Sequence, residues 1–94
     1  MTFKYNNVYI NDSATVTGPY ESNGPLSKYF DKSYDDLYFG TKTWELAEVK
    51  LIEESIDILL NKISKTKFDI NVLISGDLLN QLVATNYAAS SLGI

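Results

Sequence analysis

The longest regular pattern in the sequence runs from Thr43 to Ser64 and predicts one long helix. Thr41 or Thr43 suits the N-cap, where a hydroxyl accepts a hydrogen bond from a first-turn amide. Apolar residues form two neighbouring stripes, so we expect this helix to be buried on more than one side. The stripes consist of Trp44, Ala47, Leu51, Ile58 and Leu59, and of Val49, Ile52, Ile56 and Ile63. The face expected to be solvated, rather than catalytic, carries Glu45, Glu53, Glu54 and Asp57.

The segments on either side of this helix predict a parallel sheet. Phe3 to Ile10 is rich in β-forming residues and predicts a strand. Val72 to Ser75 is a continuous apolar run, typical of a strand covered on both faces. We therefore expect the long helix to form a right-handed crossover between these two strands. A last helix is predicted from Ala84 to Leu92, with Gly93 as its left-handed C′ residue. The order is β–long loop–α–β–α, an α/β class with parallel strands.

The long connection between the first strand and the long helix has two possible roles. Asn11 to Gly24 is dominated by turn-forming residues. The following stretch, from Leu26 to Tyr38, carries aromatic and apolar residues at helical spacing, and Ser33 with Asp36 is suited to cap a short turn. This aromatic segment either packs as a local cover over the core or docks another protein.

Composition excludes several kinds of chemistry. The 94 residues contain neither cysteine nor histidine, which excludes disulfides, thiolate nucleophiles, histidine bases and Cys/His metal sites within them. We expect no cofactor. Twelve acidic residues outnumber eight lysines, for a net charge of −4, so nucleic-acid binding is disfavoured. The cluster Lys62, Lys65 and Lys67 is interpreted as cations at the end of the long helix.

Length and hydropathy indicate one domain at most. The sequence has no apolar run approaching the roughly 20 residues that span a bilayer. Its N-terminus lacks the apolar core of a secretory signal, so we expect a cytoplasmic location.

The turn "SGDLLNQ" holds the candidate functional residues Asp77, Asn80 and Gln81. It follows a predicted strand and precedes a helix, the position at which open α/β sheets bind ligands. Free amides at the start of the following helix are suited to a carboxylate ligand. The alternative is that these polar residues only form the turn, while the two leucines between them pack against a partner.

The same turn, followed by "NYAASSLGI", resembles the N-terminal part of the thiolase superfamily. The upstream stretch "GPLSKYFDKSYDDLYFGTKTWELAE", together with "GDLLNQLVATNY", is similar to the stage V sporulation protein AD family, thiolase-like proteins of endospore-forming bacteria. The resemblance extends from about Val8 to Ile94. It implies that residues 1–94 form an incomplete, N-terminal portion of a thiolase-like domain. It also implies that the turn with Asp77, Asn80 and Gln81 lies near a dimer interface.

The function implied by this resemblance is binding of dipicolinic acid and its uptake into the developing spore, without catalysis. Asp77 beside this dicarboxylate implies a bridging cation such as Ca²⁺. The implied partners are dipicolinic acid, free or as its Ca²⁺ chelate, membrane proteins of the same operon, and a second copy of the chain. The implied location is the forespore, peripheral to the inner spore membrane. The alternative is a thiolase-like condensing or acyl-transfer enzyme whose Cys and His lie beyond Ile94.

Overall fold

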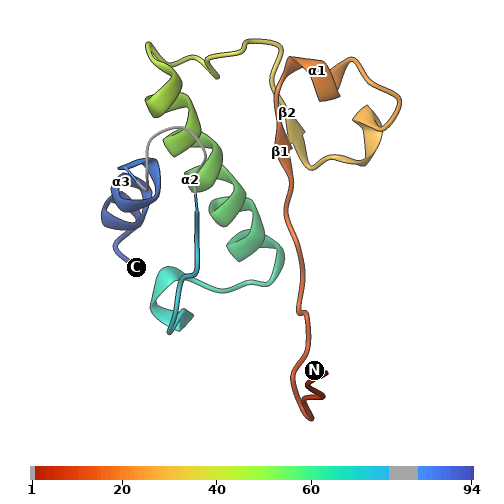
Figure 1. Ribbon diagram of the computed structural model, residues 1–94, viewed down its shortest axis with the longest axis vertical. Coiled ribbons are helices and arrows are strands. Elements are labelled where there is room, and N and C mark those ends of the chain that lie inside the picture. Colours follow the sequence, from red (N-terminus) through yellow and green to blue (C-terminus); the bar gives the residue numbers. More distant parts are fainter. Residues whose placement is uncertain (1, 77–82) are drawn as a thin grey trace.

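A long central helix with a small two-stranded unit on one side and a second helix on the other makes up the fold (Figure 1). The computed structural model describes residues 2–76 and 83–94. The elements are β1 (Val16–Thr17), α1 (Pro19–Ser22), the 3₁₀-helix η1 (Ser27–Tyr29), β2 (Lys32–Ser33), α2 (Trp44–Lys62), the 3₁₀-helix η2 (Lys67–Asp69) and α3 (Val83–Leu92). Within this described part, no helix has the length and apolar character required to cross a bilayer.

Helix α2 confirms the prediction for Thr43 to Ser64. Thr43 is the N-cap, and its hydroxyl accepts a hydrogen bond from the amide of Leu46 at 3.1 Å. Lys62 lies in the last turn, where a cation interacts favourably with the helix dipole. Ala47 is buried, and residues 48–56 and 58–60 are half-buried, so the helix is covered on more than one side, as its two apolar stripes predict.

Helix α3 lies against α2 through its smallest side chains. Ala84 and Ala88 are one helical turn apart, therefore on one face, and both are buried. The helix ends at Leu92, and Gly93 follows with φ of 74°, a left-handed conformation that glycine adopts without a Cβ clash. The predicted helix from Ala84 to Leu92 and its glycine C′ residue are both confirmed.

The parallel strand pair lies entirely before α2. Val16 pairs with Lys32, and Thr17 with Ser33. The amide of Lys32 donates to the carbonyl of Thr15 at 3.1 Å, and that of Tyr34 donates to the carbonyl of Thr17 at 2.9 Å. The α/β class with parallel strands is thus confirmed.

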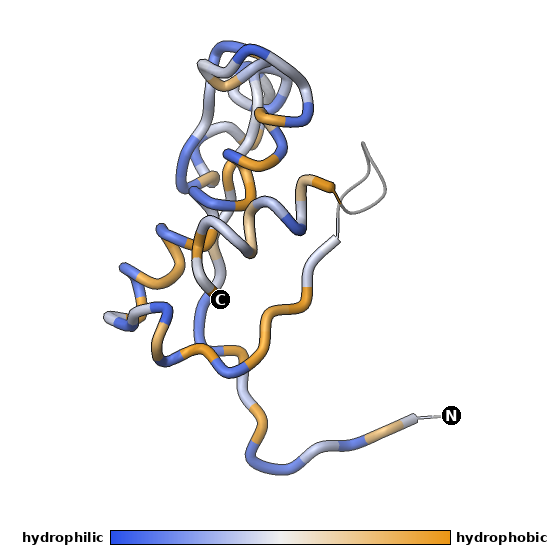
Figure 2. Tube along the Cα trace, turned by 90° about the vertical axis from the view of Figure 1, so that its left-hand side faces the viewer, coloured by the Kyte–Doolittle hydropathy of each residue, from blue (hydrophilic) through white to orange (hydrophobic). Residues whose placement is uncertain are grey.

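The predicted positions of the strands are wrong. Phe3 to Ile10 and Val72 to Ser75 form no strand, although both carry strongly hydrophobic residues (Figure 2). Their apolar side chains are exposed, 94% in the case of Ile10, except that of Leu73, which is half-buried. The crossover between β1 and β2 is made by α1 and η1, and α2 does not connect two strands. The physical reason is that β-propensity reports how well a side chain fits a neighbouring strand, and neither segment has one within the described residues.

The aromatic segment is also less helical than its spacing predicts. Between Leu26 and Tyr38 the only helical residues are those of η1. Asp36 does cap a turn, since its carboxylate accepts hydrogen bonds from the amides of Tyr38 and Gly40 at 3.1 and 2.9 Å. Ser33 instead belongs to β2, where its hydroxyl lies 2.9 Å from that of Thr17.

The buried core is small for the length of the chain. Among the described residues, the buried apolar side chains are Phe39, Ala47, Ala84 and Ala88. The radius of gyration is 14.8 Å, whereas size scaling gives roughly 12 Å for a compact domain of this length. The difference reflects the extended N-terminal segment, which leads away from the helices in Figure 1.

Candidate functional site

The candidate residues Asp77, Asn80 and Gln81 lie outside the described residues, so their placement stays a prediction. The residues that flank them in sequence are described. Gly76 is exposed, and Val83 is the first residue of α3. The surroundings of these two residues therefore define the candidate site.

Gly76 is among the residues that line a hollow in the described part of the chain. This hollow measures about 750 Å³ and separates the β1–α1 segment from one face of α2. Val16, Phe39 and Leu51 are among the apolar residues that line it, which makes its surface predominantly apolar. Its size is within the range of small-molecule sites, roughly 300–1,000 Å³.

The charged groups of this hollow are acidic. Glu21 and Glu48 are among its described lining residues, and none of these residues is a lysine. Carboxylates repel a dianion such as dipicolinate. The described wall of this hollow is therefore better suited to contact an apolar part of a ligand than an anionic group.

Phe39 projects into this hollow from a left-handed turn. Its φ is 52°, and an aromatic residue rarely adopts this region. Two side chains hold the turn. The Asp36 carboxylate accepts hydrogen bonds from two backbone amides of the turn, and the Lys50 ammonium donates one to the Phe39 carbonyl at 2.8 Å. The Phe39 ring makes an edge contact with Tyr34 at a centroid distance of 5.1 Å. The backbone conformation of Phe39 is therefore held by hydrogen bonds to the turn, and its ring by the contact with Tyr34.

Glu54 connects β2 and the residue after it to α2. Its Oε1 accepts a hydrogen bond from the Tyr34 hydroxyl and lies 3.2 Å from the Lys32 ammonium. The ammonium groups of Lys32 and Lys50 each lie 5.1 Å from the centroid of the Tyr34 ring, within cation–π range. Burial raises the pKa of Glu54, but the hydrogen bonds from Tyr34 and Lys32 outweigh it and hold this pKa below its ordinary value.

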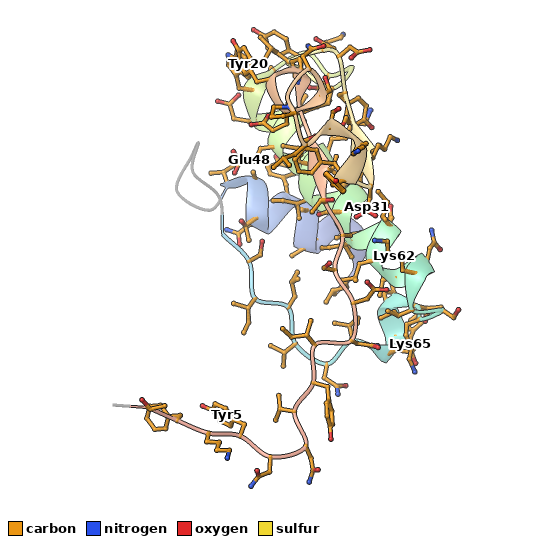
Figure 3. All side chains as sticks on the ribbon, turned by 90° about the vertical axis from the view of Figure 1, so that its right-hand side faces the viewer. Tyr5, Tyr20, Asp31, Glu48, Lys62 and Lys65 are labelled. Atoms are coloured by element: carbon orange, nitrogen blue, oxygen red, sulfur yellow. The ribbon has the colours of Figure 1, made fainter. Side chains whose placement is uncertain are left out.

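A second ion pair fixes the other end of the same unit. The Lys62 ammonium lies 2.5 Å from Asp31 and donates to the carbonyl of Ser13 at 2.9 Å (Figure 3). Asp31 also accepts hydrogen bonds from the amide and hydroxyl of Thr15. The hydrogen bond from Lys62, followed by that from the Thr15 amide, lowers the pKa of Asp31.

The expectation that Glu53 and Glu54 are solvated is wrong, because both are half-buried and join elements. Glu53 accepts a hydrogen bond from the Ser91 hydroxyl of α3 at 2.7 Å. Both carboxylates also line a second hollow of about 660 Å³, together with Lys42 and Lys50. Asp57 lines it as well, so three carboxylates face two ammonium groups there. No group of three acidic residues among the described residues is placed to hold a metal ion.

Sequence reasoning missed the Glu54 cluster. Tyr34 and Glu54 are separated by 20 positions, and neither belongs to a motif. No local pattern in the sequence indicates this pair.

The described residues define the class of protein, a mixed α/β chain with an apolar hollow beside its long helix. Comparison with known proteins gives the family. The chain matches the family Stage V sporulation protein AD (SpoVAD) over residues 1–94 and belongs to it. It is 45% identical over 87 residues to "Stage V sporulation protein AD" of Bacillus subtilis (strain 168). This alignment covers 93% of the chain and 26% of the relative, so the chain spans about a quarter of the relative's length.

Proposed function

We propose that this chain forms one part of a protein that binds dipicolinic acid and takes part in its uptake into the developing spore. The observation that carries the proposal is the family match along the whole chain, residues 1–94. The name of the Bacillus subtilis relative places that protein in sporulation, at stage V. Dipicolinic acid as the ligand comes from the resemblance of the turn and the upstream segments to the family.

In this proposal the chain supplies a wall of the binding cleft rather than its anion-binding charges. The apolar hollow beside Gly76 offers a surface for the flat pyridine ring. Glu21 and Glu48 disfavour the free dianion, and a Ca²⁺ chelate would reduce this repulsion. The positive groups that bind the carboxylates would come from residues outside this chain.

The proposed role is non-catalytic. The 94 residues contain no Cys and no His to act as nucleophile or base in acyl transfer. A location in the forespore, peripheral to the inner spore membrane, with membrane proteins of the same operon as partners, belongs to the same proposal.

A chimera tests this proposal in a whole protein. The matched quarter of the Bacillus subtilis relative is replaced by residues 1–94, and the chimera is expressed in a sporulating strain that lacks the relative. We expect the spores to accumulate dipicolinic acid, measured by its fluorescence with terbium. A chimera that is present at normal levels but leaves the spores without dipicolinic acid would contradict the proposal.

Calorimetry of the isolated chain tests whether the groups that bind the carboxylates lie outside it. We expect no measurable heat of binding with dipicolinate, with or without Ca²⁺, because the anion-binding charges are outside the described hollow. Micromolar affinity would show instead that these residues contain the complete site. Turnover of acyl-thioesters by the chimera, absent from a matched variant lacking its cysteines, would favour the enzyme alternative.

A further inference from the structure

Asn23 and Gly24, directly after α1, are the one place in the sequence where a glycine follows an asparagine. Every other asparagine of the chain precedes a residue that carries a Cβ. Glycine has no Cβ, so its backbone nitrogen can approach a neighbouring side chain closely. Asn23 is exposed, and the loop that contains it lies at the outer edge of the two-stranded unit (Figure 1).

We propose that Asn23 is a site of spontaneous covalent modification, at which the side-chain amide is converted to a carboxylate. The Gly24 nitrogen loses its proton to hydroxide and attacks Cγ of Asn23, so that a C–N bond forms and closes a succinimide ring. The Cγ–Nδ2 bond breaks, and Nδ2 takes up a proton from water and leaves as ammonia. Water then opens the ring at either carbonyl, which gives aspartate or isoaspartate. In total, one water is consumed and one ammonia is released.

Two hydrogen bonds restrain the reacting groups. Nδ2 of Asn23 donates to the Pro19 carbonyl at 2.8 Å, and the Gly24 amide donates to the Glu21 carbonyl at 3.1 Å. Both must break before rotation about the Cα–C bond of Asn23 brings the Gly24 nitrogen to Cγ. This opening costs little, because α1 has four residues and none of them is buried. The reaction therefore proceeds from a locally opened turn, without unfolding of α2.

The aspartate product lacks a donor where the fold uses one. The Pro19 carbonyl accepts hydrogen bonds from the side chain and the amide of Asn23 and from the Ser22 hydroxyl. A carboxylate at position 23 sets an acceptor against this carbonyl, and the two oxygens repel each other. The new charge also lies at the C-terminal end of α1, where free carbonyls disfavour an anion and the last turn has no basic residue. The modification therefore loosens α1.

This loosening changes the wall of the candidate site. Pro19, Tyr20 and Glu21 of α1 all line the apolar hollow. A displaced α1 thus alters the hollow on the side opposite α2. The chemistry at Asn23 is independent of the ligand that the hollow binds, so it holds whether or not that ligand is dipicolinic acid.

Peptide mass spectrometry of the chain, incubated at neutral and at alkaline pH, tests the chemistry. We expect Asn23 to change from amide to acid faster than every other asparagine, at a rate that rises with pH. Isoaspartate should appear beside aspartate, because direct hydrolysis of the amide gives aspartate alone.

Gly24→Ala is the matched control, and it should slow the reaction about tenfold or more, because a methyl group hinders the attacking nitrogen. The added Cβ lies no closer than 3.4 Å to its neighbours, so the turn is retained. Equal rates in the two proteins, an unchanged Asn23, a faster reaction at another asparagine, or aspartate without isoaspartate would each overturn the proposal.

Hydrogen exchange tests the effect on α1. Asn23→Asp reproduces the aspartate product. The Ser22 amide, which donates to the Gly18 carbonyl at 3.0 Å, should then exchange faster by a factor of about 2–10, the effect of one lost hydrogen bond. Asn11→Asp is the same substitution in the exposed N-terminal segment and should leave this amide unchanged. Unchanged exchange in Asn23→Asp, or an equal change in Asn11→Asp, would overturn the loosening of α1.

Discussion

The contact between α2 and α3 depends on small side chains, and enlarging one of them gives the sharpest test of the fold. Ala88 has no exposed surface, and Ala84 lies one turn before it on the same face, 1% exposed. Ala88→Leu adds three carbon atoms where no space is open. Overpacking of this kind costs about 1–3 kcal/mol, because neighbouring side chains leave their preferred rotamers or the backbone shifts. We therefore expect the variant to lower the free energy of unfolding by about 1–3 kcal/mol.

Urea unfolding, followed by far-UV circular dichroism and by the fluorescence of the single tryptophan, Trp44, measures this change. In thermal unfolding the expected loss is about 4–8 °C in melting temperature per kcal/mol for a domain of this size. The matched control is Ala89→Leu, the same substitution at the adjacent, half-buried position, which should change the free energy of unfolding by less than about 0.5 kcal/mol. Equal unfolding midpoints for the two variants would refute close packing of α3 on α2 through Ala88.

Three further changes test particular contacts. Thr43→Ala should lower the free energy of unfolding by about 1 kcal/mol in urea titrations, because the Leu46 amide loses its cap, whereas Thr43→Ser should retain stability. Glu54→Gln should be less stable than the unmodified chain at neutral pH, and this difference should shrink as the pH falls below 4.5, the ordinary Glu pKa. The sign follows from the lowered pKa of Glu54 in the fold, whose stabilisation is present above the unfolded-state value and lost as the carboxyl protonates; a constant difference would contradict it. Gly93→Ala should destabilise by about 1 kcal/mol in the same assay, because φ of 74° is unfavourable for alanine; an unchanged midpoint would show that residue 93 takes another conformation.

Helices α2 and α3 could be predicted because their signals are local. Thr43 directly precedes α2, and the apolar repeat lies within that helix. The alanines lie within α3, and Gly93 directly follows it. Capping and 3.6-residue periodicity require no knowledge of the rest of the fold. The strands could not be predicted in this way. β1 and β2 contain two residues each, too few to show any alternation.

What fixes β1 and β2 is a set of partners distant in sequence. Asp31 accepts a hydrogen bond from the amide of Thr15, 16 positions earlier in the sequence. Lys62 of α2 forms an ion pair with Asp31 and donates a hydrogen bond to the carbonyl of Ser13. These contacts stabilise a pair of short strands that propensity alone would leave as loop. The candidate turn with Asp77, Asn80 and Gln81 lies outside the described residues, so its prediction stays open.

The wrong strand predictions have one physical cause. Phe3 to Ile10 has the composition of a strand, but a strand is stabilised by cross-strand neighbours and by hydrogen bonds that a single segment cannot supply. Where no neighbour is present, the segment keeps its apolar side chains exposed, as Tyr9 and Ile10 do. Its sequence therefore specifies a capacity for pairing rather than a position in this fold.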